Sequence, residues 1–169
     1  QFEQARTMTS QLASFSVLAN MPDKNIRKHA IDAFYEQWQG DELVLDKWFA
    51  VQAQSTLPGT LEHVQGLLTH KAFDIQNPNK VRALIGAFCQ GNPRHFHAID
   101  GSGYSFLALQ IKVLDALNPQ IAARLTIPFT RWQKLDKPRQ DLMQAQLKTL
   151  AAGKLSKDVR EMVEKSLSA

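Results

Sequence analysis

Apolar residues recur every three or four positions along almost the whole chain. This spacing places them on one face of successive helices, because an α-helix turns once every 3.6 residues. No alternating run long enough for a β-strand interrupts the pattern, and the run 73–75 is too short to count. The pattern therefore predicts an all-α protein. The apolar faces group in the segments 8–19, 26–38, 45–53, 61–68, 81–88, 104–117, 121–129, 142–150 and 159–167.

Three Asn-Pro pairs mark helix starts within this pattern, at Asn77, Asn92 and Asn118. An Asn side chain can accept a hydrogen bond from a free N–H group of the first turn. The proline that follows needs no N–H partner and already has a helical φ. Helices of this length, joined by short turns, can stack as antiparallel pairs or form a compact bundle. No linker divides the chain, so a single domain over 1–169 is expected.

Charge and composition narrow the function classes. The net charge is +4, but Lys and Arg are scattered and mostly interleaved with acidic residues, as in 157–161. A nucleic-acid-binding protein normally shows a basic stripe, so no nucleic-acid partner is expected. No segment is long and apolar enough for a membrane helix, so no membrane partner is expected either. The lone Cys89 excludes an internal disulfide and fits a reducing, cytoplasmic compartment.

Large aromatic residues and the cysteine are interpreted as packing residues. Trp38, Trp48, Phe49 and Trp132 fall at core-like spacings. Cys89 follows Ile85 by four positions, which predicts a buried structural thiol rather than a reactive one.

One short segment contains residues that can bind a metal ion. His95, His97 and Asp100 lie close together in the sequence, before a glycine-containing turn. Two histidines without further ligands are weak evidence for a metal site, so we predict that they bond loop backbone groups and that the chain holds no metal. Asp100 or Ser102 is expected to cap the helix that follows the turn.

Three sequence words carry a family resemblance. They are NPNKVR with LIGAF in 77–88, FHAIDGSGY in 96–104, and NPQIAAR in 118–124. In this order and at this spacing they resemble the C-terminal domain of bacterial aminopeptidase N, a zinc aminopeptidase of the gluzincin type. The resemblance implies a curved α-solenoid of antiparallel helix pairs, similar to HEAT and armadillo repeats. It also implies that the chain comes from a longer, cytoplasmic bacterial aminopeptidase.

The resemblance further implies where the chemistry lies. The zinc motif His-Glu-x-x-His is absent, because none of the five histidines is followed by Glu. The zinc and the general base would therefore belong to an upstream catalytic domain, which becomes the expected partner. The chain itself is expected to contain no catalytic residue and to be inactive alone. Its expected role is to close the internal cavity over the active site, restrict entry, and contact peptide substrates.

Three residues match family positions that face the substrate, namely Arg82, Gln120 and Arg124. The two arginines would lie toward the C-terminal side of a bound peptide, and Gln120 toward the pocket for its N-terminal side chain. Gln120 and Arg124 are four residues apart, so they share one helical face. Both arginines are expected in early helical turns, where a cation opposes the helix dipole. Lys80 stands where relatives can carry Arg, and no role is assigned to it.

Two other readings of the residues remain open. Arg82 and Arg124 can be ordinary surface arginines. The whole chain can also be a free-standing α-solenoid that binds a partner protein, as many such proteins do.

Overall fold

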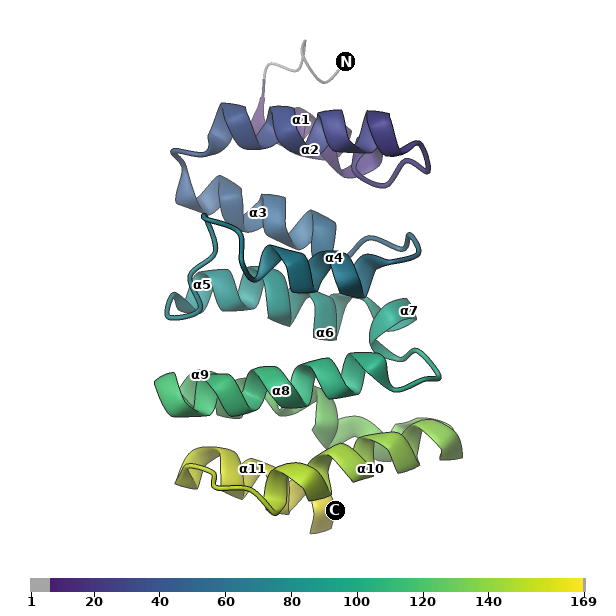
Figure 1. The fold of residues 1–169 in the computed structure, drawn as a ribbon, viewed down its shortest axis with the longest axis vertical. Helices are drawn as coiled ribbons and strands as arrows, with labels where there is room; N and C mark the ends of the chain where they lie inside the picture. The colour runs from purple at the N-terminus through teal and green to yellow at the C-terminus, as the bar shows by residue number, and fades with distance from the viewer. Residues whose placement is uncertain (1–6, 169) are drawn as a thin grey trace. The chain divides into compact units, whose positions relative to one another are not determined.

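The computed structural model describes residues 7–168, and every regular element within this range is a helix (Figure 1). The all-α class predicted from the apolar spacing is confirmed. The chain divides into two compact units, residues 1–88 and 89–169. The boundary falls inside helix α6 (Ala87–Gly91), and the single domain expected over 1–169 stays a prediction. None of the described helices combines the length and apolar character needed to cross a membrane.

In the first unit, successive helices pack against one another. They are α1 (Met8–Leu18), α2 (Lys24–Trp38), α3 (Glu42–Ala53) and α4 (Thr60–Leu67), followed by α5 (Pro78–Val81) and the π-helix η1 (Arg82–Gly86). Helix α1 packs on α2, α2 packs on α3, and α3 packs on both α4 and η1. The backbone stays helical from α5 through η1 into α6, so these three elements form one rod.

Aromatic side chains fill the core of this unit. The rings of Phe15 and Phe34 stack with centroids 4.3 Å apart and join α1 to α2. Trp48 and Phe49 meet edge to face at 4.9 Å, and both are buried, as predicted. The indole N–H of Trp48 donates to a backbone carbonyl of α2 at 3.0 Å, so its polar atom is satisfied. Each fully buried Phe contributes about 1.5–3 kcal/mol to stability.

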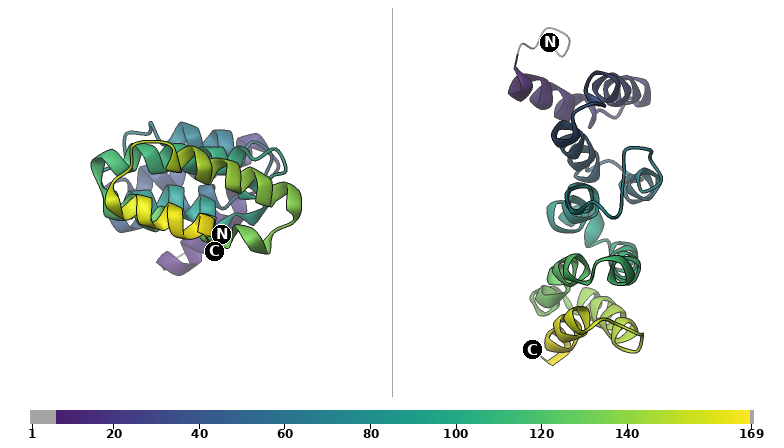
Figure 2. Two further views of the ribbon diagram at one scale, coloured as in Figure 1. Left: turned by 90° about the horizontal axis from the view of Figure 1, so that it is seen from below. Right: turned by 90° about the vertical axis from the view of Figure 1, so that its left-hand side faces the viewer.

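The second unit begins with the short helix α7 (Pro93–Phe96). The hairpin of α8 (Ser102–Leu117) and α9 (Pro119–Leu125) follows, and then come the 3₁₀ helix η2 (Ile127–Lys134), α10 (Lys137–Ala151) and α11 (Lys157–Ser168). Helix α8 packs on α9 and α10, while α11 packs on α9, α10 and η2. Many helices appear end-on in the right-hand view of Figure 2, so neighbours within a unit lie side by side.

Two polar contacts close the second unit. The buried indole of Trp132 on η2 donates to the backbone oxygen of Ser166 on α11 at 2.8 Å. The carboxylate of Asp115 on α8 accepts from the backbone N–H of Ser156 at 2.8 Å and from its hydroxyl. Ser156 in turn accepts from the N–H of Val159, so the start of α11 is held against α8.

The three Asn-Pro starts are confirmed. The side chains of Asn77, Asn92 and Asn118 accept backbone N–H groups of the first turn at 2.9, 3.2 and 3.2 Å. A proline follows each one at the first helical position. Aspartates provide the same cap for three further helices, at Asp23, Asp41 and Asp136.

The helix expected over 121–129 is wrong in one respect, because the structure breaks it in two. Helix α9 ends at Leu125, and the chain continues as the 3₁₀ helix η2. Pro128 explains the break, since it disfavours α-helical geometry at the residue before it and supplies no N–H group. As a result Arg124 lies in the last turn of α9 rather than in an early turn. Its charge complements the helix dipole there, contrary to the expectation from sequence.

Candidate functional site

Arg82 lies on the exposed side of the rod formed by α5, η1 and α6. Asn77 caps the rod, and Arg82 is the fifth residue after it, at the first position of the π-helical turn. Its guanidinium donates a hydrogen bond to the side-chain oxygen of Asn79, one turn earlier. Within residues 7–168, the Arg82 side chain makes no further hydrogen bond or ion pair. Arg82 therefore keeps donors for a ligand.

A shallow surface groove of about 320 Å³ lies beside Arg82, between α3 and the rod. It is lined by Asp46, Lys47, Ala50, Asn79, Arg82 and Ala83. The lining of the groove carries both charge signs, from the carboxylate of Asp46 and the cations of Lys47 and Arg82. The sequence resemblance had indicated only the arginine.

Lys80 is two residues from Arg82 and has the opposite surroundings. Its side chain is 4% exposed, and its ammonium group lies 2.8 Å from a carboxylate oxygen of Asp46 on α3. It also donates to the backbone oxygen of Glu42 at 3.0 Å, and the Glu42 carboxylate lies 3.4 Å away. These contacts give Lys80 a structural role that the sequence did not show, because it fixes the rod to the start of α3.

Gln120 and Arg124 lie together on the exposed face of α9. The opposite face buries Ala122 and Leu125, which sets the rotation of the helix. Both Gln120 and Arg124 are exposed, and neither side chain has a hydrogen-bond partner among residues 7–168. The shared face predicted from their spacing is present in the structure. Arg82 belongs to the first unit, whereas Gln120 and Arg124 belong to the second.

The glycine-containing turn before α8 is a structural corner. Gly101 has φ of 73°, a left-handed conformation, and occupies the N-cap position of α8 itself. A Cβ on Gly103 would lie 2.3 Å from the backbone oxygen of Phe96, so only glycine fits there. Asp100 accepts the N–H of Ser102 at 2.9 Å, which lowers the pKa of the Asp100 carboxyl. The expected cap by Asp100 or Ser102 is thus replaced by a turn in which Asp100 bonds the first helical residue.

His97 is held by protein groups on two sides. Its Nδ1 lies 2.8 Å from the Tyr104 hydroxyl, and its backbone oxygen accepts from Arg139 at 2.7 Å. Burial, and secondarily the positive charge of Arg139, lowers the pKa of His97. The Nε2 atom of His95 is buried and has no partner in the described part of the chain. Within residues 7–168, no three His, Cys, Asp or Glu side chains are grouped so that they could hold a metal ion.

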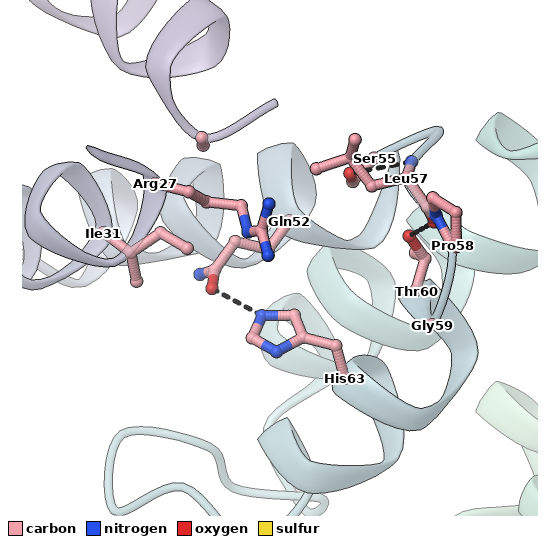
Figure 3. Close-up of a pocket in the computed structure, with 10 residues that line it drawn as sticks. Arg27, Ile31, Gln52, Ser55, Leu57, Pro58, Gly59, Thr60 and His63 are labelled. Atoms are coloured by element: carbon pink, nitrogen blue, oxygen red, sulfur yellow. Dashed lines mark hydrogen bonds between the residues drawn. The ribbon is translucent and has the colours of Figure 1, made fainter. Parts of the chain in front are cut away.

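A second pocket, of about 110 Å³, lies in the first unit between α2, α3 and the start of α4 (Figure 3). The amide nitrogen of Gln52 donates to the Trp48 carbonyl, so the amide oxygen accepts from Nε2 of His63 at 2.9 Å. This arrangement assigns the proton of the neutral His63 ring to Nε2. Burial, and then the charge of Arg27, lowers the pKa of His63. These residues are far apart in sequence, so no local pattern could have indicated the pocket.

Cys89 is buried, as predicted. Burial raises the pKa of its thiol, which disfavours the reactive thiolate.

Comparison with known proteins identifies the family. The model of the domain family DUF3458_C, described as a domain of unknown function with ARM repeats, matches residues 1–168. The chain belongs to this family. The ARM-repeat description confirms the predicted α-solenoid class, because ARM repeats are stacked helical units.

Named relatives of this family member are aminopeptidases. The chain is 43% identical to aminopeptidase N of Escherichia coli and 41% identical to that of Caulobacter vibrioides, over 99% and 98% of its length. It spans 19% of the length of each of these relatives. A crystal structure of Legionella pneumophila aminopeptidase A in complex with aspartic acid matches 99% of the chain with a TM-score of 0.94 and 39% identity. That match covers 20% of the Legionella chain.

Proposed function

We propose that this chain is the C-terminal domain of a zinc-dependent aminopeptidase, which removes N-terminal residues from peptides. The similarity to aminopeptidases over 98% or more of the chain is the observation that carries the proposal. In the intact enzyme the domain would close the internal cavity over the active site and restrict entry to peptides and unfolded chain ends. The enzyme is expected to be cytoplasmic.

The zinc ion of this enzyme would be bound outside the chain described here. The sequence contains no His-Glu-x-x-His motif. Within residues 7–168, no three His, Cys, Asp or Glu side chains are grouped so that they could supply a ligand set. Zinc would activate a water molecule for attack on the first peptide bond. The chain alone is expected to be inactive, and its catalytic partner is the upstream part of the same polypeptide.

The exposed polar residues of the two units would bind the substrate. Arg82 and Arg124 present guanidinium groups with free donors, and a guanidinium remains charged and can make two parallel hydrogen bonds to a carboxylate. Gln120 offers both a donor and an acceptor one helical turn from Arg124. In this proposal the arginines bind the C-terminal side of a short peptide, while Gln120 contacts the N-terminal side chain. Inside a closed cavity these attractions are less screened than in bulk water.

Tripeptides and aminoacyl arylamides can distinguish the proposed role of the two arginines from that of Gln120. A tripeptide has both the N-terminal side chain that Gln120 would contact and the C-terminal carboxylate that the arginines would bind, whereas an aminoacyl arylamide has no C-terminal peptide portion. We expect Arg82→Ala and Arg124→Ala in the intact enzyme to raise KM for tripeptides about tenfold, the loss of roughly one charge-assisted hydrogen bond. KM for the arylamide should stay within about twofold. Gln120→Ala should raise KM for both substrates. Unchanged tripeptide KM in all three variants would refute the proposed binding role.

A further inference from the structure

A pocket of the second unit lies between the end of α6, the residues around the end of α7, and the 3₁₀ helix η2. Its volume is about 320 Å³, and all of its lining residues belong to the second unit. Small-molecule sites in proteins have volumes of about 300–1,000 Å³, so this pocket has room for a small ligand. Arg82, Gln120 and Arg124 do not contribute to it.

The geometry of η2 determines which of its side chains face the pocket. A 3₁₀ helix has three residues per turn, so residues three positions apart lie one above the other. One such row, formed by Phe129 and Trp132, is buried. Another row, formed by Pro128, Arg131 and Lys134, lines the pocket. The 3₁₀ turn that follows α9 therefore aligns two cations along one wall.

These two cations have no acidic partner. Arg131 and Lys134 are exposed, and in the part of the chain that the structure describes neither side chain makes a hydrogen bond or an ion pair. No Asp or Glu is among the described residues that line the pocket. Asp136, the acidic residue that follows in the sequence, is paired with Arg139 instead. An anion bound between Arg131 and Lys134 would remove the repulsion between their charges.

Most of the remaining lining is apolar. Phe96 and Cys89 are 1% and 4% exposed, so they line the pocket from the core. Ile127, which is 41% exposed, and Leu135 add further apolar surface. Ligand sites commonly combine an apolar lining with a few charged groups that orient the ligand. This lining therefore fits a ligand that has both an apolar body and a negative charge.

His97 adds a polar group to the lining. Its Nδ1 lies 2.8 Å from the Tyr104 hydroxyl, whereas its Nε2 has no partner among residues 7–168. The free Nε2 edge can form a hydrogen bond with a polar group of a ligand.

The helix dipole accounts for part of this arrangement. Both cations lie in the last turn of η2, where a positive charge is favoured. The dipole does not account for the apolar pocket beside them, since a basic helix end that only faces water needs no such lining. The combination of the two features is what indicates a ligand.

We propose that this pocket binds a small organic carboxylate with an apolar body. The carboxylate lies between the guanidinium group of Arg131 and the ammonium group of Lys134, and the apolar body packs on Phe96, Ile127 and Leu135. A guanidinium can make two parallel hydrogen bonds to a carboxylate. A free carboxylic acid and the apolar C-terminal residue of a peptide share this chemistry. The inference does not rest on the proposed function, because it uses none of the residues proposed to bind the substrate.

Phenylacetate is a suitable probe, because it has a carboxylate and an aromatic ring but no amino group. Isothermal titration calorimetry of the intact polypeptide should show saturable binding. Arg131→Gln should weaken it about tenfold and Lys134→Gln about threefold or more, since each loses a charge-assisted contact. Lys112→Gln is the control, because it removes an exposed cation of α8 that does not line the pocket, and it should keep the wild-type affinity. No binding, or equal affinity in all four proteins, would overturn the inference.

Related compounds test the class of ligand. Phenylacetamide lacks the charge and acetate lacks the apolar body, so each should bind about tenfold or more weakly than phenylacetate. If acetate or inorganic phosphate bound as tightly as phenylacetate, the cations alone would bind anions and the proposed class would be wrong. N-acetyl-alanyl-phenylalanine presents the same groups at the end of a peptide. Tighter binding of this peptide than of phenylacetate would identify a peptide end as the source of the ligand, and weaker binding would identify a free acid.

Activity measurements separate this pocket from the substrate site. Arg131→Gln should leave KM for tripeptides within about twofold, and Arg124→Ala should leave the affinity for phenylacetate within about twofold. Arg131→Gln should also keep the wild-type melting temperature within about 1 °C, which excludes unfolding as the cause of lost binding. If phenylacetate competes with a tripeptide and binds equally well to Arg131→Gln, it occupies the active site and the inference is wrong. Failure of the pocket and failure of the substrate-binding role are therefore distinguishable.

Discussion

Lys80 and Arg82 are cations on the same helical rod and are separated by a single residue. Lys80 is buried, whereas Arg82 is exposed. Lys80 is buried and bonded to Asp46 and to the carbonyl of Glu42. Arg82 is exposed, and within residues 7–168 its side chain bonds only Asn79, one turn away. A charge that is buried must be paired, whereas a charge with free donors is available to a ligand. Both residues lie in the segment NPNKVR, so one short stretch of sequence combines a residue that holds the fold together with a residue proposed to bind the substrate.

The other two segments that carry the family resemblance also contain buried residues, and one of them contains exposed residues of the candidate site as well. In FHAIDGSGY, Gly103 and Tyr104 are buried parts of a close-packed corner. In NPQIAAR, Ala122 is buried while Gln120 and Arg124 are exposed. Substitutions at the buried positions should therefore change stability, and substitutions at the exposed positions should change substrate binding alone.

The largest effect is expected at Gly103. Gly103→Ala places a methyl group 2.3 Å from the backbone oxygen of Phe96, and backbone cannot move aside cheaply. We expect the free energy of unfolding to fall by about 3 kcal/mol or more. Gly66→Ala is the control, because nothing lies within 4 Å of its added Cβ in α4. It should be neutral or stabilise by up to about 1 kcal/mol. Chemical denaturation of the 169-residue chain measures both, and equal effects would refute the close approach.

Lys80→Met is expected to have the next largest effect. It keeps the aliphatic volume but leaves the Asp46 carboxylate, whose side chain is 20% exposed, without its cation. Because Asp46 retains some contact with water, we expect a loss of about 2 kcal/mol, below the value for a fully buried pair. Lys47→Met, at an exposed position on the same helix as Asp46, should stay within about 0.5 kcal/mol. If the two variants unfold alike, Lys80 does not have the structural role described.

Acidic pH should destabilise the chain through His63 and His97, whose pKa values are lowered in the folded state. Burial lowers the pKa of His63, and the same cause lowers that of His97. The unfolded state therefore binds protons more readily, and stability falls as the pH drops below about 6.5, the ordinary histidine value. His63→Gln should reduce the slope of unfolding free energy against pH between about 7 and 5. A flat wild-type profile between these pH values would contradict the prediction.

The smallest stability effects are expected at the exposed site. Arg82→Ala, Gln120→Ala and Arg124→Ala each remove an exposed side chain, and among residues 7–168 only Arg82 has a side-chain hydrogen bond to lose. Each should change the unfolding free energy of the 169-residue chain by less than about 0.5 kcal/mol. Thermal unfolding checks this directly. A loss above about 1 kcal/mol at Arg124 would mean that its role is structural.

Much of the fold could be predicted because helical information is local. Apolar spacing and Asn-Pro starts depend on residues within one or two turns, and the structure has helices and caps at those places. The signal for the helix break, Pro128, is also local. The apolar spacing nevertheless predicted a continuous helix, because it continues to Phe129. In contrast, the partner of Lys80 is 34 residues away, and the contact of Gly103 depends on how two segments meet. No local pattern encodes such contacts.

The candidate site could be predicted only in part, for a related reason. The spacing of Gln120 and Arg124 fixed their shared helical face, and their exposure followed from the burial of Ala122 and Leu125. The groove beside Arg82 depends on how α3 packs against η1, which is a tertiary feature. The sequence therefore indicated the residues of the candidate site, whereas the groove beside Arg82 could be found only in the structure.

The most direct test of the central claim pairs one substitution with one change in the substrate. Wild-type intact enzyme and Arg124→Ala are assayed with a tripeptide and with the same tripeptide carrying a C-terminal amide. If Arg124 binds the peptide carboxylate, the substitution should raise KM about tenfold for the acid, the loss of about 1.4 kcal/mol. It should change KM for the amide by less than about twofold. Equal changes for the two peptides, or no change for either, would contradict the claim.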